Sequence, residues 1–423
     1  MNASAPRWHR APGGGPAAAA LMSLRCGTRD DPPGGCGTAH ILEHLVFQGT
    51  RSAPTGAAVA GDFERLGVRF NAFTGRELSG LYALGDGRAV RAALPLLLEA
   101  VAEPTLTEEG LAHAKAVVAL ELRQRAGRPQ RHLRELAMSV LVGDHPAGRP
   151  VAGREDEVAA LTVDDVRAFW RRWAAASTTL LITGGDVDET VVTGALSGVT
   201  LPDPPVARAV APVGSAAARG GYVVVGSTQV AMAVVFPGAS YLLDRRDILV
   251  ARVLSTLFGG MRSSRLALEL RQERQWCYET SSTLECHADF GALLGICMVA
   301  PADVARCADT VVAVLTALAD DGPTLDELDR ATAQLRSAYA LEWSSGLDQV
   351  QMIARDLHRR GSLVGYLEFR ELVDSIGVAD VQRLAARLLE AEPSVVAFGP
   401  AEGLAVLRDG ATAAKSLEEC GWG

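Results

Sequence analysis

Short apolar runs alternate with amphipathic stretches along this chain of 423 residues. Apolar runs of about four to eight residues between turn signals are typical of strands, and apolar positions recurring every three or four residues are typical of helices. The pattern predicts strands at 17–24, 68–74, 78–84 and 178–184, and helices at 89–101, 107–123 and 163–173. Strands and helices interspersed in this way indicate an α+β protein.

The second half of the chain repeats the order of the first. A strand at 230–236 is followed by a glycine-containing turn and a helix at 244–258, and the first half begins with the same strand, turn and helix. Between the halves the composition shifts to proline, alanine and glycine, which is typical of a linker. We therefore expect two copies of one α+β unit, with domains at 1–200 and 222–423 and a linker at 201–221.

The composition is that of an ordinary globular protein, with 48% hydrophobic and 22% charged residues. The net charge of −9 argues against a nucleic-acid partner, and no apolar run is long enough to span a membrane. The seven cysteines are scattered without a C-x-x-C pair, which favours a reducing compartment. We expect a cytoplasmic protein with neither a nucleic-acid nor a membrane partner.

A segment with candidate chemistry follows the turn at 32–35. Thr38 is a suitable N-cap and Gly49 a suitable stop for a helix between them. On that helix His40, Glu43 and His44 share one face, because residues three and four apart are neighbours. Two imidazoles one turn apart can bind zinc, and the glutamate beside them is placed to take a proton from a metal-bound water. A surface helix with two solvated histidines would show the same pattern, so a third ligand must decide.

Glu121 is the candidate for that third ligand. It lies in the predicted helix at 107–123, on the same side as the apolar stripe of Leu111, Ala114, Val117 and Val118. A carboxylate on a buried face is costly unless it is paired or bound to a metal. A buried salt bridge is the structural alternative, but a metal ligand explains the position better beside a two-histidine site.

These residues resemble the pitrilysin/insulinase family of zinc peptidases, in the branch that includes the mitochondrial processing peptidases. The family pattern is H-x-x-E-H followed after about 76 residues by a third-ligand glutamate, and Glu121 falls at that position. Five further segments occur in family order, at 27–30, 43–50, 66–67, 71–74 and 145–150. The resemblance covers nearly the whole chain and implies two homologous α+β domains, each an antiparallel-rich sheet with helices packed on it.

The resemblance also implies a metal site. One Zn²⁺ per chain would be bound by His40, His44 and Glu121, with Glu43 as the general base. Ala114 stands where the family often carries an acidic residue that orients the third ligand, a departure that bears on the rate more than on metal binding.

In the family, the strand that corresponds to Asn71, Ala72 and Phe73 lies beside the zinc and binds extended peptides by edge pairing. Main-chain pairing of this kind accepts many peptide sequences. Without the zinc site, Asn71 would be interpreted as an ordinary polar residue near a turn.

The second half resembles the family's signature S-R-L followed by R-[DE]-x-x-G-L-x-Y. Arg271 and Tyr278 match its arginine and tyrosine, which hold the substrate backbone and stabilise the oxyanion in the family. Gln275 replaces the usual glycine, and Trp276-Cys277 replaces Leu-Ala. The alternative is an arginine and a tyrosine that pack at a helix end.

The resemblance implies a zinc endopeptidase that hydrolyses short or unfolded peptides inside a chamber formed by two chains. Its physiological role could be either leader-peptide processing or general peptide clearance. A homodimer is expected, because one chain carries both the zinc motif and the Arg/Tyr pair. The alternatives are a subunit that is active only as a heterodimer with a related chain, and a zinc-binding scaffold without peptidase activity.

Overall fold

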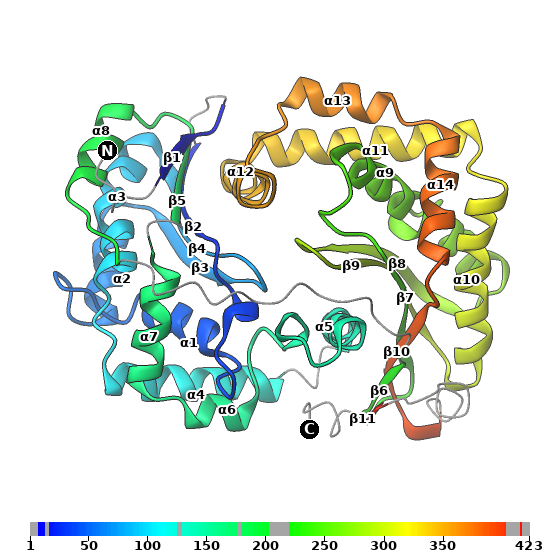
Figure 1. Cartoon of the computed structure of the whole chain (residues 1–423), viewed down its shortest axis with the longest axis horizontal. Coiled ribbons are helices and arrows are strands. Elements are labelled where there is room, and N and C mark those ends of the chain that lie inside the picture. Colours follow the sequence, from blue (N-terminus) through cyan, green and yellow to red (C-terminus); the bar gives the residue numbers. More distant parts are fainter. Residues whose placement is uncertain are drawn as a thin grey trace. The chain divides into compact units, whose positions relative to one another are not determined.

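The computed structural model of the chain describes residues 7–12, 17–124, 129–175, 179–202, 220–402 and 415–416. Contacts divide it into two compact units, both shown in Figure 1. The first unit contains the described parts of 1–123, 149–211 and 341–363. The second contains those of 124–148, 212–340 and 364–423.

The first unit is built around a sheet of β1 Arg7–Arg10, β2 Ala17–Leu24, β3 Arg69–Thr74, β4 Ser79–Asp86 and β5 Thr179–Gly184. The order across the sheet is β1-β5-β2-β4-β3. β1 lies parallel to β5, and the other neighbouring pairs are antiparallel. The four strands predicted in this half are therefore confirmed, and β3 lies at an edge.

The second unit is built around β6 Gly221–Val224, β7 Val230–Pro237, β8 Cys277–Cys286, β9 Gly291–Val299, β10 Ser394–Gly399 and the short β11 Lys415–Ser416. Their order is β11-β6-β10-β7-β9-β8. Apart from β11, this order repeats that of the first sheet, with the first strand of the unit parallel to its last and every other pair antiparallel. The predicted α+β repeat is confirmed at the level of topology.

The helices of the first unit are α1 Thr38–Leu45, α2 Gly56–Arg65, α3 Gly87–Ala102, α4 Glu108–Gln124, α6 Glu155–Ala160, α7 Val163–Trp173, α8 Glu189–Ser197 and α12 Gly346–Arg360. They cover both faces of the sheet, because residues along a strand alternate between its faces. Ala20 and Met22 of β2 join a core with α1 and α3. Leu21 joins a second core with Val350 and Ile353 of α12, which lies beside β5 in Figure 1.

The helices of the second unit are α5 Pro129–Val142, α9 Arg245–Ser255, α10 Val304–Asp320, α11 Leu325–Ser344, α13 Tyr366–Asp374 and α14 Val378–Leu389. α5 packs on β7 and β10, and α10 and α14 also contact β7. The helix predicted at 244–258 corresponds to α9, which continues into a short π-helix at Thr256–Gly260. No helix in the described ranges is both long and apolar enough to cross a lipid bilayer.

Each unit takes one helix from the other half of the chain. α5 precedes the predicted linker but belongs to the second unit, whereas α12 follows it and belongs to the first. The contact-defined units therefore cut across the predicted domains 1–200 and 222–423. Most of the predicted linker at 201–221 lies outside the described residues, and the division into homologous halves stays a prediction.

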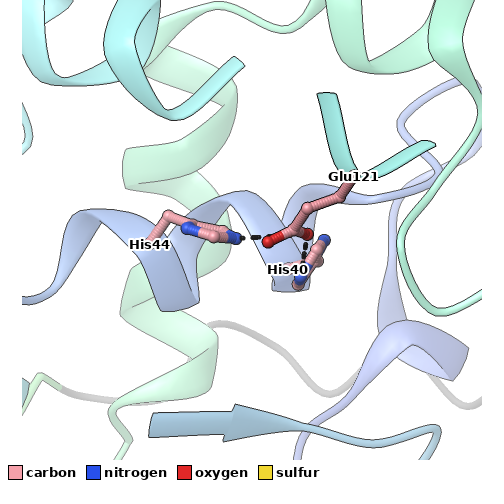
Figure 2. Close-up of side chains that lie close together, drawn as sticks. All are labelled: His40, His44 and Glu121. Carbon is pink, nitrogen blue, oxygen red and sulfur yellow. Dashed lines mark ion pairs between the residues drawn. The ribbon is translucent and has the colours of Figure 1, made fainter. Parts of the chain in front are cut away.

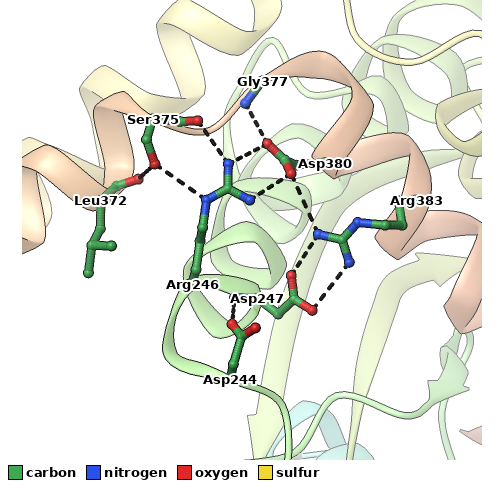
Figure 3. Close-up of polar contacts among 8 residues, drawn as sticks. All are labelled: Asp244, Arg246, Asp247, Leu372, Ser375, Gly377, Asp380 and Arg383. Carbon is green, nitrogen blue, oxygen red and sulfur yellow. Dashed lines mark hydrogen bonds and ion pairs between the residues drawn. The ribbon is translucent and has the colours of Figure 1, made fainter.

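An ion-pair network joins the start of α9 to α14 in the second unit (Figure 3). Two guanidinium nitrogens of Arg246 donate to Asp380, each at 2.6 Å. Arg383 donates to Asp247 at 2.7 and 3.2 Å, and it lies 3.5 Å from Asp380. Asp380 also accepts from the Gly377 backbone N–H at the start of α14. These hydrogen bonds, led by those from Arg246, hold the pKa of Asp380 well below its usual range.

Candidate metal centre

Helix α1 presents a buried apolar face and a polar face. Ile41, Leu42 and Leu45 are buried in the core of the first unit, so the side chains of His40, Glu43 and His44 lie on the opposite, half-buried face. The predicted N-cap is wrong by one residue. Gly37 caps the helix with a φ of 106°, in the left-handed region that glycine adopts readily, and Thr38 is the first helical residue.

The three predicted metal ligands converge at one point (Figure 2). Glu121 Oε2 lies 3.5 Å from His40 Nε2 and 3.8 Å from His44 Nε2, and the three candidate ligand atoms all lie within 4.8 Å of one another. Ligand atoms at zinc-bond distance in a tetrahedral site lie about 3.3–3.6 Å apart. His44 Nε2 is buried and has no hydrogen-bond partner among the described residues. The donor set, its spacing and this buried nitrogen all fit a zinc ion.

Glu121 reaches this point from α4, whose bounds confirm the helix predicted at 107–123. Leu111, Ala114 and Val118 are buried as expected, whereas Val117 is only half-buried. The side chain of Glu121, however, is 44% exposed, so the expectation of a buried carboxylate is wrong. Glu121 lies at the margin of the apolar face, where its stem reaches the two imidazoles and its carboxylate remains partly hydrated.

Two shifted pKa values define the electrostatics of the site. Burial raises the pKa of Glu43, while a hydrogen bond with the Thr74 side chain lowers it and the nearby Glu121 raises it further. Burial is also the main cause that lowers the pKa of His44. The negative charge of Glu121 raises this pKa in part, and His113 lowers it slightly. His44 is therefore favoured as a neutral imidazole, the form that binds metals. Sequence reasoning did not single out Thr74 or His113 for these roles.

The predicted peptide-binding strand is β3, whose only neighbour in the described sheet is β4. Ala72 is buried, Phe73 is half-buried and Asn71 is exposed. The Asn71 side chain accepts a hydrogen bond from the Ala72 backbone N–H at 2.9 Å. Thr74 lies at the end of this strand and its hydroxyl is 3.5 Å from the carbonyl of Ala39 in α1. The strand that offers an open edge thus adjoins the helix that carries the histidines.

Arg271 and Tyr278 lie in the second unit, on either side of the turn between the helical segment Ala267–Glu273 and β8. The guanidinium carbon of Arg271 lies 5.1 Å from the centre of the Tyr278 ring, which is a cation–π contact. Tyr278 is 81% exposed. The structure therefore brings this pair together, and its role in binding substrate stays a prediction. Gln275, where the family signature has glycine, adopts a φ of 56°.

Two family models match adjoining parts of the chain. The model described as insulinase, peptidase family M16, matches residues 13–155. The model described as the peptidase M16 inactive domain matches residues 160–335. The zinc motif falls in the first match and the Arg/Tyr pair in the second.

Relatives match over most of their length. The chain is 29% identical to an uncharacterized zinc protease of Mycobacterium leprae over 88% of this chain and 85% of the relative. It is 28% identical to an uncharacterized zinc protease of Streptomyces coelicolor, covering 88% of this chain and 83% of the relative.

Solved structures agree on the fold. A protease from Helicobacter pylori matches with a TM-score of 0.84 at 21% identity, covering 94% of this chain and 98% of that structure. A peptidase M16 inactive domain from Pseudomonas fluorescens matches with a TM-score of 0.83 at 20% identity, covering 95% and 97%. With both halves matched by models of one family and full-length relatives named as zinc proteases, the chain belongs to the insulinase, or pitrilysin, family of peptidases.

Proposed function

We propose that this protein is a zinc-dependent endopeptidase that binds one Zn²⁺ through His40, His44 and Glu121 and hydrolyses short or unfolded peptides. The observation that carries the proposal is the convergence of these three side chains from two helices. Glu43 lies on the same helix face, one residue before His44 and three after His40. The relatives named as zinc proteases support the same chemistry.

Each side chain then has a defined part in peptide hydrolysis. Zinc held at this point would supply the positive charge that acidifies water and polarises a carbonyl. Glu43 takes the proton from the attacking water, and its pKa, raised by burial, favours a base that later returns the proton to the leaving amine. The Thr74 side chain at the end of β3 favours the charged form of Glu43, which is the form that accepts the proton. The substrate pairs with the open edge of β3 beside Asn71, so its main chain lies extended.

A metal analysis and one substitution test this proposal. The purified chain should bind about one zinc per chain and cleave quenched fluorescent peptides, and a chelator should abolish the cleavage. Glu43→Gln should retain the zinc and lose the activity, because an amide keeps the shape of the carboxylate but cannot accept the proton. Absence of zinc after supplementation would refute the metal site. Cleavage by the Glu43→Gln variant at near wild-type rate would refute the assigned base.

We further propose a homodimer in which Arg271 and Tyr278 of one chain complete the zinc site of the other. The presence of both residue sets on one chain supports self-association. Glu43→Gln and Tyr278→Phe each weaken a different part of such a site. In a mixed dimer one site has both defects and the other has neither. If half of the dimers are mixed and each of these has one intact site of two, equal mixing should recover roughly a quarter of wild-type activity.

The mixing experiment separates the competing assemblies. If Arg271 and Tyr278 act within their own chain, every site keeps one defect and mixing recovers nothing, even when mass measurements show that chains exchange. If the wild-type chain alone binds zinc but cleaves no peptide, a related partner chain is required, and adding it should restore activity. A zinc-binding chain that stays inactive with every candidate partner would be the scaffold alternative.

A further inference from the structure

The N-cap residue of helix α1, Gly37, makes no side-chain hydrogen bond to the first turn. The first N–H groups of a helix need acceptors, and Gly37 has no side chain to supply one. The acceptor comes instead from Asp31, six residues earlier. One carboxylate oxygen of Asp31 accepts from the Gly37 N–H at 2.8 Å, and the other accepts from the Ala39 N–H at 2.9 Å. The second of these bonds holds the backbone N–H of Ala39, the residue before His40.

Asp31 is itself held firmly. It is 2% exposed, and Arg149 donates to its backbone carbonyl at 3.0 Å and to that of Pro32 at 3.3 Å. Further along the same loop, the Cys36 N–H donates to Glu157 at 2.8 Å. The loop between β2 and α1 is therefore fixed by side chains from the segment that follows α5.

The start of α1 also has no room to shift. A Cβ on Gly37 would lie 2.7 Å from a methyl of Val158 and 2.9 Å from the Cα of Gly153. Backbones that approach this closely fix the position of the helix along its axis. The two hydrogen bonds to Asp31 fix its rotation, because they join both oxygens of one rigid carboxylate to two N–H groups of the first turn.

We propose that Asp31 is the positioning residue that orients helix α1 so that His40 and His44 meet Glu121. The inference rests on the proposed function, since it concerns the same metal site. Metal sites tolerate little displacement of their ligands, about 0.5 Å. His40 is one residue and His44 five residues beyond the Ala39 N–H that Asp31 holds, so a rotation at the first turn moves both imidazoles together relative to Glu121.

The chemistry of Asp31 supports a positioning role over a purely stabilising one. Burial raises its pKa to about 7, although the hydrogen bonds from Gly37 and Ala39 and the charge of Arg149 lower it. A buried carboxylate of this kind opposes folding once it ionises, because stability is lost as the pH rises through the raised pKa. The ionised form of Asp31, which has two acceptor oxygens, is therefore costly to bury, yet it stands where two backbone N–H groups need acceptors.

Asp31→Asn tests the proposal, because asparagine keeps the shape but presents only one acceptor oxygen to the two N–H groups. The zinc dissociation constant of the full chain is measured by competition with a chelating dye. The cobalt-substituted protein is examined by visible spectroscopy. We expect the zinc affinity to fall about 10- to 100-fold and the visible absorption bands of the cobalt protein to shift. In peptide cleavage, kcat should fall by a larger factor than the factor by which KM changes. Loss of thermal stability alone would not move the cobalt bands.

Asp188→Asn is the matched control. Asp188 caps α8 in the same unit by accepting from the Thr190 N–H at 2.8 Å, and α8 carries no candidate ligand. This variant should keep wild-type zinc affinity and cobalt spectrum. If Asp31→Asn fails to fold, Arg149→Met replaces it, and a smaller loss of zinc affinity in the same direction is expected.

The outcomes separate the two proposals. A wild-type chain that binds no zinc contradicts both the proposed function and this inference. A wild-type chain that binds zinc, with Asp31→Asn matching it in affinity and cobalt spectrum, overturns the positioning role and leaves the proposed function intact. The same holds for Arg149→Met, if it is the variant tested and its zinc affinity is unchanged.

Discussion

Replacing Gln275 by glycine should stabilise the protein. Gln275 follows the helical segment Ala267–Glu273 and has a φ of 56°. The Trp276 N–H donates back to the Leu270 carbonyl at 3.0 Å across this residue. This resembles a helix C-terminal motif in which the left-handed residue is usually glycine. The Gln275 side chain is exposed, so its removal should forfeit little packing.

The magnitude follows from two opposing effects. A residue with a Cβ loses about 1–2 kcal/mol in the left-handed conformation, whereas glycine loses about 0.5–1 kcal/mol more backbone entropy on folding. The difference favours Gln275→Gly by about 0.5–1 kcal/mol. For a unit of this size that corresponds to a rise of about 2 °C in the unfolding midpoint, measurable by calorimetry.

Gln272→Gly is the matched control, because it removes the same side chain three residues earlier. Gln272 is exposed and lies within the helical segment, where glycine costs about 1 kcal/mol. The two variants should therefore shift the midpoint in opposite directions. If Gln275→Gly melts at or below the wild-type temperature while Gln272→Gly is destabilised, the left-handed backbone is not a source of strain.

Two further predictions concern stability. Burial lowers the pKa of His358, whose ring nitrogen lies 3.1 Å from Ser23 Oγ, to about 4. The unfolded chain therefore binds the extra proton between pH 6.5 and 4, and this residue should cost about 2 kcal/mol of stability between pH 7.5 and 5. Thermal unfolding of His358→Gln should lack that share of the acid sensitivity of wild type, and equal acid sensitivity would contradict the shift. Asp380→Asn should lower the free energy of unfolding by about 1 kcal/mol in urea titrations, because it weakens the paired hydrogen bonds from Arg246. Asp374→Asn, at a more exposed ion pair, should change it by less than about 0.5 kcal/mol, and equal effects would show that the network adds nothing.

Local spacing predicted the residues of the candidate site because helix geometry translates spacing directly into direction. His40, Glu43 and His44 had to share a face once their segment was helical, and α4 carries Glu121 to the same point. The exposure of the Glu121 side chain was harder to predict. Glu121 lies at the margin of the apolar face of α4, and sequence periodicity does not distinguish the margin of such a face from its centre.

Contacts that depend on tertiary structure were beyond the sequence pattern. Asp31 accepts hydrogen bonds from the start of α1 although it lies six residues before the N-cap, whereas the sequence pattern predicts a cap at Thr38, next to the helix. The assignment of α5 to the second unit and α12 to the first also depends on tertiary structure. Each helix has an ordinary amphipathic pattern, and nothing in that pattern specifies which of two similar sheets it will cover.

Among the described residues, a candidate metal site is found in the first unit alone, although the two units share one topology. α1 and α9 occupy equivalent places, each following the second strand of its unit. α1 keeps one face open and places two histidines on it, and its cap comes from the distant Asp31. α9 is capped by its own Asp244 and is buried on most sides, with Asp247 committed to Arg383. α9 therefore has a smaller share of half-buried positions than α1, and arginines occupy them. In the second unit the residues with a predicted role in chemistry lie elsewhere, Arg271 in the helical segment Ala267–Glu273 and the exposed Tyr278 in β8.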